Sequence, residues 1–194
     1  CRFVNFSIFH IFALNMSTKQ DKIQEDLQKE LQSTEEKTVL DAIYKIKYHG
    51  HPKLIPDLLN RWFNSSGEIE NALTNLLYSL KDKAVIPVLF EEIDKSKNKD
   101  HREKIISILW NAGLEPKNYL VKLIQIAIKG DFLEALECLT VIENMEPPFP
   151  EDQLMESQIL LKEYFANHPT GDKVSIIRSI VTFIQFTEDT QIDI

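Results

Sequence analysis

Glycine and cysteine are scarce in this sequence. Its 194 residues include 5 glycines and 2 cysteines, and no run of alternating apolar residues marks a strand. β-Sandwiches and nucleotide-binding α/β sheets need more glycine than this for their turns and phosphate loops. Cys1 and Cys138 provide neither a disulfide framework nor the paired spacing of a metal site. We therefore expect an all-α, cytoplasmic protein in which Cys138 is a small apolar side chain on a helix.

Basic residues are also too few to balance the acidic ones. The chain has 22 Lys and Arg against 30 Asp and Glu, a formal net charge of -8. Because proteins bind nucleic-acid phosphates through basic surface, this balance disfavours DNA or RNA as the main ligand.

Long hydrophobic runs are absent as well. Residues 1–15 are apolar but fall short of the roughly 18 to 20 residues that a membrane-spanning helix needs. We interpret 1–15 as an extension outside the native fold, with Met16 as the natural start. A signal peptide or a lipidated Cys1 remains an alternative for this segment. The expected domains are then a single repeat domain at 16–186 and an acidic tail at 187–194.

Capping boxes recur along the chain at a nearly constant interval. In such a box, a Ser or Asp side chain accepts a hydrogen bond from the first helical turn, and a Glu three residues later reaches back to it. The pairs are Ser33 with Glu36, Ser65 with Glu68, Asp100 with Glu103, and Asp131 with Glu134. Successive caps lie 32, 35 and 31 residues apart, which predicts a repeated structural unit.

The apolar residues that follow each cap repeat too. Their spacing of i, i+1, i+4 places three side chains on one stripe of a helix. These core triplets are Ala42, Ile43, Ile46; Ala72, Leu73, Leu76; Ile105, Ile106, Leu109; Ala135, Leu136, Leu139; and Ile176, Ile177, Ile180. Together with the intervening segments, they predict five antiparallel helix pairs: 19–32 with 34–48, 52–63 with 66–80, 83–96 with 101–113, 117–129 with 131–145, and 150–167 with 172–186. We expect glycines at 50, 113 and 130 to close helices in the left-handed conformation.

A repeat near thirty residues is typical of stacked helical solenoids. The tetratricopeptide and ankyrin signatures are missing. The helix-pair pattern instead resembles HEAT and HEAT-like repeats, through Pro56 and Pro87 in the first helices and through Val39, Ala42, Ile43 and Ile46 in a second helix. The resemblance covers about 36–144 and implies a right-handed superhelix whose second helices line a concave face.

If that resemblance holds, the side chains that point away from the core stripes of the second helices form a binding surface. The face is polar with a few aromatic rings, which commonly anchor protein interfaces. The candidate partner-binding residues are Tyr44, Tyr48, Asn71, Asn75, Tyr78, Ser107, Trp110, Asn111 and Glu137. An alternative is that Tyr48, Tyr78 and Trp110 only pack between helices.

Charge is unevenly distributed along the repeats. Residues 131–168 contain nine acidic side chains and one base, Lys162, whereas five basic residues gather at 95–104. Such polarity could steer an oppositely charged partner. The alternative interpretation is a solvated basic loop beside a solvated acidic end.

Catalytic and metal-binding motifs are sparse. His49 and His51 with Asp57 form the one grouping that could approach a metal, and a third ligand is not defined. We therefore predict no metal and no cofactor. Our leading hypothesis is a monomeric, non-catalytic scaffold that binds a protein or peptide. The alternative is a nucleic-acid binder or DNA-processing enzyme similar to HEAT-like alkylpurine glycosylases, with Asp41 or Glu137 and Trp110 as its site.

Overall fold

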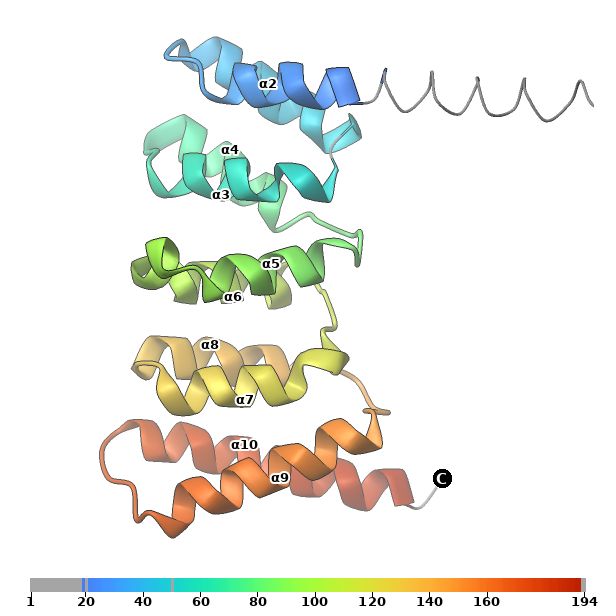
Figure 1. The fold of residues 1–194 in the computed structure, drawn as a ribbon, viewed down its shortest axis with the longest axis vertical. Coiled ribbons are helices and arrows are strands. Elements are labelled where there is room, and N and C mark those ends of the chain that lie inside the picture. Colours follow the sequence, from blue (N-terminus) through green and yellow to red (C-terminus); the bar gives the residue numbers. More distant parts are fainter. Residues whose placement is uncertain (1–18, 20, 50, 193–194) are drawn as a thin grey trace, which may run out of the picture. The chain divides into compact units, whose positions relative to one another are not determined.

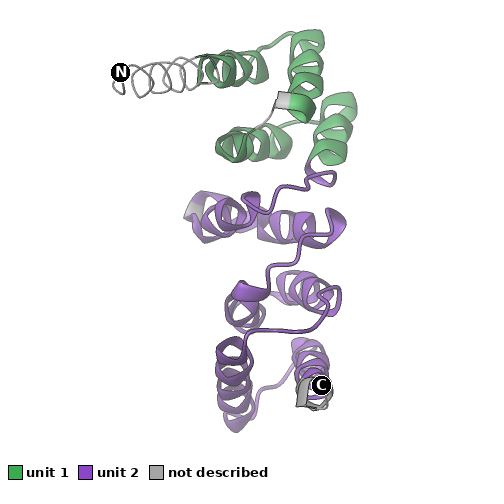
Figure 2. Cartoon of the chain, turned by 90° about the vertical axis from the view of Figure 1, so that its right-hand side faces the viewer, with its two compact units in different colours: residues 1–76 green, residues 77–194 purple. Residues whose placement is uncertain are grey.

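The computed structural model describes residues 19, 21–49 and 51–192, and this part of the chain consists of helices and their connections, without a strand (Figure 1). The all-α prediction is confirmed for these residues. The apolar segment 1–15 lies outside the described part. None of the described helices is long and apolar enough to cross a membrane. The chain divides into two compact units, Cys1–Leu76 and Leu77–Ile194 (Figure 2).

The first unit contains the helices predicted for the first two pairs. A helix covers 21–31, and the elements after it are α2 (Glu36–His49), the 3-10 helix η1 (Pro52–Leu54), α3 (Ile55–Phe63) and α4 (Gly67–Leu77). Pro52 occupies the first turn of η1, where its missing N–H would have no partner in any case. The core contains the predicted stripe Ala42, Ile43 and Ile46, and Leu73 and Leu76 of the second stripe, whose Ala72 is only half-buried.

The second unit contains three further helix pairs. Its elements are α5 (Val85–Asp94), η2 (Ser96–His101), α6 (Arg102–Asn111), η3 (Lys117–Tyr119), α7 (Leu120–Lys129), α8 (Phe132–Glu143), α9 (Glu151–Ala166) and α10 (Lys173–Ile192). α8 packs against α7, α6 and α10, while α7 also packs against α9 (Figure 1). Within this unit, the second helices of the pairs thus form one layer, and α7 and α9 lie in the other. α10 runs to Ile192 rather than ending near 186 as predicted.

Several of the polar contacts within the two units join residues about one repeat apart. In the first unit, Gln28 Nε2 donates to Asp57 Oδ2 at 2.7 Å. In the second, the contacts pair Tyr78 with Ser107, Lys81 with the Ala112 carbonyl, Asp94 with Lys122, Arg102 with Glu134, Trp110 with Glu137, Glu115 with the Glu146 N–H, and Val121 N–H with Gln153. All these separations lie between 27 and 32 residues. Because this interval matches the spacing of the sequence repeat, equivalent positions of consecutive helix pairs lie side by side within each unit.

Of the four predicted capping boxes, the structure confirms the one at α8. Glu134 N–H donates to Asp131 Oδ1, and Asp131 N–H donates to Glu134 Oε2, each at 2.9 Å. The prediction is wrong for Asp100, because η2 continues directly into α6 and His101 takes the cap position. It is also wrong for Ser65, whose buried hydroxyl makes no hydrogen bond among the described residues. Ser33 Oγ instead accepts from the N–H of Glu35, before α2 begins.

Two helix-end glycines behave differently. Gly113 has φ +67°, so it closes α6 in the left-handed conformation as predicted. Gly130 has φ -77°, so the prediction is wrong there. A Cβ at this position would instead collide with the Glu134 side chain and the Ile126 carbonyl oxygen. Gly130 is therefore suited to the close approach of the capping carboxylate. Gly50 lies outside the described residues.

The rotation of α8 also differs from the prediction. Ala135 is buried, but Leu136 is 39% exposed, and the core side of α8 is formed by Ala135, Cys138, Val141 and Ile142. The capping box holds Glu134 inward, 6% exposed, with Arg102 at 3.6 Å. Residues two apart on a helix point about 200° apart. Turning Glu134 inward therefore turns Leu136 toward solvent.

Candidate functional site

The predicted binding residues divide between the two units. Four belong to the first unit and five to the second. The first set is Tyr44, Tyr48, Asn71 and Asn75; the second is Tyr78, Ser107, Trp110, Asn111 and Glu137. We therefore describe two surfaces, each within its own unit.

Tyr44 and Tyr48 form an exposed aromatic pair on α2. They lie one helical turn apart, opposite the buried Ala42, Ile43 and Ile46, and they are 65% and 63% exposed. Their rings meet edge to face, with centroids 5.3 Å apart. A hydrogen bond to Tyr48 raises the pKa of Tyr44, so Tyr44 keeps its hydroxyl proton at neutral pH. This exposure disagrees with the alternative in which Tyr48 only packs between helices.

On α4, Asn71 and Asn75 are both exposed. Their spacing of one turn places both amides on the same side of this helix. They contribute polar groups to the first unit's surface.

In the second unit, Tyr78 and two of its neighbours form an internal polar network. Tyr78 Oη lies 3.2 Å from Ser107 Oγ. Ser107 Oγ donates its single proton to the Lys104 carbonyl, so it accepts from Tyr78. Asn111 Nδ2 donates to the Ser107 carbonyl at 2.9 Å. These side chains link the chain after α4 to α6, which agrees with the alternative of packing for Tyr78.

Trp110 and Glu137 come together across α6 and α8. The indole Nε1–H donates to Glu137 Oε2 at 2.7 Å, and both side chains are half-buried. Next to Glu137, one turn earlier on α8, lies Leu133. Leu133 is 56% exposed and belongs to a cluster of exposed apolar side chains that we call the α8 patch: Phe132, Leu133 and Leu136.

The repeat pattern does not predict the α8 patch, because it assigns Leu136 to the core. Exposed apolar side chains that cluster on one element are more informative than scattered ones, because they mark interaction surfaces. The adjacent apolar residues at 132 and 133 are the sequence signal, since one buried stripe cannot accommodate both together with Ala135.

Two members of the histidine grouping, His51 and Asp57, have hydrogen-bond partners of their own among the described residues. His51 Nδ1 accepts from the N–H of Lys53 at the start of η1, and Asp57 accepts from Gln28. Among the described residues, no three His, Cys, Asp or Glu side chains gather closely enough to hold an ion.

The basic segment at 95–104 is organised around a buried carboxylate, Glu92, that sequence analysis did not identify. Glu92 is 1% exposed and pairs with Lys95. Asn98 Nδ2 donates to the carbonyl and to Oε2 of Glu92, at 2.8 and 2.9 Å. Arg102 Nε donates to the carbonyl of Ile93. Lys95 and Arg102 thus make polar contacts within the fold, and Lys95, Lys97 and Lys99 are all exposed.

Cys138 lies on a helix, α8, as predicted, and its side chain is fully buried. Burial raises the pKa of its thiol strongly, and the nearby Glu134 and Glu137 carboxylates raise it further. Both effects disfavour the thiolate, which is the reactive form of cysteine.

We expect Cys138 to resist alkylation by iodoacetamide at pH 8.5 in the folded protein, because the thiol is both uncharged and covered. Peptide mass spectrometry measures this site separately from Cys1. Full labelling should appear in urea. Rapid labelling without denaturant would contradict the burial of α8.

In comparisons with protein-family models, curated proteins and solved structures, the chain has no match in any of the three.

Proposed function

We propose that this chain is a right-handed, HEAT-like α-solenoid of about five helix pairs that acts in the cytoplasm as a non-catalytic scaffold. Its partner is a protein or peptide bound on the concave face that the second helices line. The repeat-spaced polar contacts support the solenoid, as does the packing of α6, α8 and α10 into one layer. In such arrays each repeat contacts its neighbours and leaves an extended surface for binding.

The observation that carries the proposal is the exposed pair Tyr44 and Tyr48. Each ring leaves about two thirds of its surface in water, although the same helix buries an apolar stripe on its other side. Tyrosine contributes large contact area with few rotatable bonds, and its hydroxyl keeps a polar handle. Because the two rings already touch, little side-chain freedom is lost on binding.

The α8 patch gives the second unit a comparable surface. Phe132 and Leu133 are 45% and 56% exposed, and the Trp110–Glu137 pair lies beside them. A partner with apolar side chains framed by polar groups suits both surfaces.

The test is affinity capture with the wild type and the double variant Tyr44→Ala/Tyr48→Ala, followed by quantitative mass spectrometry. Removing both rings should lower the recovery of the specific partner by about tenfold or more, as expected for aromatic hot spots. Ile23→Ala is the matched control, because Ile23 is an exposed apolar residue of the same unit, 39% accessible. Recovery that is the same for all three proteins would exclude the tyrosine pair as the binding site.

The same protein samples distinguish the scaffold function from the competing DNA-processing function. It is favoured by one observation, the contact between Trp110 and Glu137, since an aromatic ring and a carboxylate also form the site of the similar glycosylases. The net charge of -8 opposes it. We expect no mobility shift of duplex DNA at low salt. A tight, salt-sensitive shift would favour the DNA function instead.

A further inference from the structure

The outward face of α8 combines apolar and acidic side chains. Phe132, Leu133 and Leu136, which form the α8 patch, are 45%, 56% and 39% exposed. Glu143 is exposed and Glu137 is half-buried. Each residue turns an α-helix by about 100°, so these five side chains all fall within about 140° around the helix axis. Apolar contact surface and negative charge therefore lie together on the side of α8 that faces away from the core.

Trp110 extends this face onto α6. Its indole Nε1–H donates to Glu137 Oε2 at 2.7 Å, which holds the carboxylate next to the ring. Glu103 is half-buried and lies on the same side of α6 as Trp110, because the two are seven residues apart. Within the described part of the chain, none of the carboxylates of Glu103, Glu137 and Glu143 forms an ion pair. Their charge is therefore available to a partner.

The basic side chains of the neighbouring helices are directed elsewhere. Arg102 pairs with the inward Glu134, and Lys173 Nζ donates to two backbone carbonyls at the end of α7. Lys104 lies about 120° away from the tryptophan around the axis of α6. Lys129 ends α7, which belongs to the other layer of helices. The face formed by the α8 patch, the indole and the three carboxylates is thus acidic.

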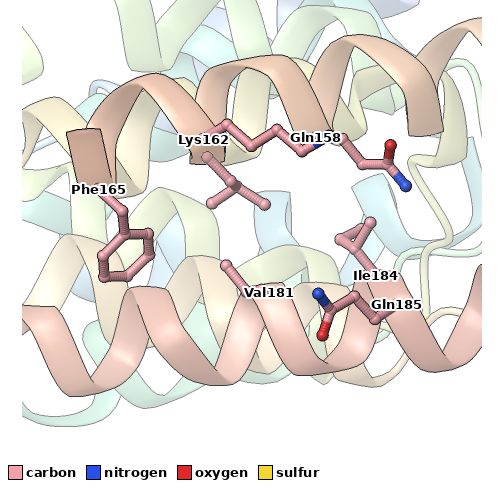
Figure 3. Close-up of a pocket in the computed structure, with 7 residues that line it drawn as sticks. Gln158, Lys162, Phe165, Val181, Ile184 and Gln185 are labelled. Atoms are coloured by element: carbon pink, nitrogen blue, oxygen red, sulfur yellow. The ribbon is translucent and has the colours of Figure 1, made fainter.

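The other surface feature of this unit, an open groove between α9 and α10, has basic side chains at its border (Figure 3). Its volume is about 400 Å³. Its lining residues are Gln158, Leu161, Lys162 and Phe165 from α9, and Val181, Ile184 and Gln185 from α10. Lys162 is exposed, and the Arg178 guanidinium lies 5.3 Å from the centre of the Phe165 ring. Basic groups on a partner are therefore disfavoured at the groove.

We propose that the α8 patch, together with Trp110 and Glu137, binds a segment of the partner protein in which apolar side chains alternate with Lys or Arg. This proposal rests on the scaffold function proposed above and names the chemistry of the partner for the second unit. Apolar side chains of the segment cover Leu133 and Leu136, and a basic group meets Glu137 beside the indole. Because aromatic rings attract cations, Trp110 adds to the preference for a base.

Charge decides against a second copy of this chain on the same face. A symmetric dimer through the α8 patch brings the same surface of both chains together. Glu137 and Glu143 of one chain then approach Glu137 and Glu143 of the other, and like charges across an interface are unfavourable. A basic segment of a different protein is complementary instead.

The test uses three labelled synthetic peptides of equal length and measures their binding to the full chain by fluorescence anisotropy. The first alternates leucine with lysine, the second alternates leucine with glutamate, and the third replaces the leucines of the first by serine. We expect the leucine–lysine peptide to bind, with an affinity that falls as salt rises. The other two should bind at least tenfold more weakly, because each lacks either the charge or the apolar contact.

Substitutions in the face should weaken binding of the leucine–lysine peptide in two different ways. Leu133→Ser removes an exposed apolar side chain, and we expect a loss of about tenfold in affinity at every salt concentration. Glu137→Gln/Glu143→Gln removes two charges, while the amide oxygen at 137 can still accept the indole hydrogen bond. We expect a loss of about threefold to tenfold at low salt and a smaller salt dependence.

Two matched variants on α9 separate the face from general attraction to an acidic protein. Glu156→Gln/Glu163→Gln removes two exposed carboxylates of the same unit. Ile159→Ser removes an apolar side chain that is 51% exposed. Neither should change the affinity by more than about twofold, and circular dichroism should show the same helix content for every variant.

Several results would overturn the proposal: equal binding of the lysine and glutamate peptides, no loss with Leu133→Ser, or an equal loss with Glu156→Gln/Glu163→Gln. Analytical ultracentrifugation tests the remaining occupant. A dimer that Leu133→Ser converts to monomer would assign the face to a second copy and contradict a basic segment.

The tyrosine variant distinguishes failure of this proposal from failure of the scaffold function. Tyr44→Ala/Tyr48→Ala should bind the leucine–lysine peptide as the wild type does, because the tyrosines belong to the first unit. An equal loss of peptide binding with this variant would contradict the α8 face as the site. If the peptide does not bind while partner capture still depends on the tyrosines, this proposal fails and the scaffold function stands.

Discussion

Ile142→Asp should unfold the second unit, whereas Leu136→Asp should leave it folded. Both residues are on α8, and both substitutions replace a branched apolar side chain by a carboxylate. Ile142 is fully buried, so its variant loses core packing and places an unpaired charge in the interior. We expect a loss of about 4 kcal/mol or more in the free energy of unfolding for Ile142→Asp. Leu136 is 39% exposed, and we expect a loss of about 1 kcal/mol or less.

Urea denaturation followed by circular dichroism at 222 nm measures both values. Leu73→Asp provides the equivalent test in the first unit, because Leu73 is fully buried on α4. The repeat pattern of the sequence assigns Leu136 to the core, so it predicts unfolding by Leu136→Asp as well. Equal destabilisation by the two α8 variants would mean that the helix has the rotation expected from the sequence.

Asn98→Ala should be the most damaging change in the basic segment. The Asn98 side chain, 5% exposed, donates hydrogen bonds to both the backbone carbonyl and the carboxylate of Glu92. Removing it leaves a buried carboxylate with Lys95 as its remaining charged partner. A buried polar group that loses its partner costs about 1 to 3 kcal/mol, and a charged one more, so we expect a loss of about 3 kcal/mol.

Hydrogen exchange locates this effect along the chain. Amides of η2 and of the first turn of α6 should lose protection first, because Asn98 connects this segment to α5. Asn118→Ala is the control, since Asn118 is an exposed asparagine of another 3-10 helix, and its effect should stay within about 0.5 kcal/mol. Similar stabilities for the two variants would show that Glu92 does not need Asn98.

The helices themselves could be predicted from local sequence. Ile105, Ile106 and Leu109 predict α6, and the equivalent stripes predict the other second helices, because spacing of i, i+1, i+4 is a property of one helix alone. The capping predictions were less successful. A cap depends on the residues just before the helix. At Asp100 those residues form η2 instead of an irregular segment.

The candidate site was predictable only in part. Tyr44 and Tyr48 were identified by their distance from the core stripe, and both are exposed. Tyr78 was identified in the same way, but it bonds to Ser107, a residue 29 positions away that its own helix does not reveal. The groove of α9 and α10 has no counterpart in any local pattern, because its lining comes from two helices.

The sequence by itself determined the number, order and approximate limits of the helices, together with the repeat interval near thirty residues. These features follow from apolar periodicity and from helix-ending residues, which act within a few positions of each other. Only the tertiary structure decided how far each helix is rotated about its axis. On α8 that rotation is set by contacts with α6, α7 and α10 and by the inward Glu134, and the apolar spacing of one helix does not reveal these contacts. Rotation in turn decides which apolar side chains stay in water, and so where a partner can bind.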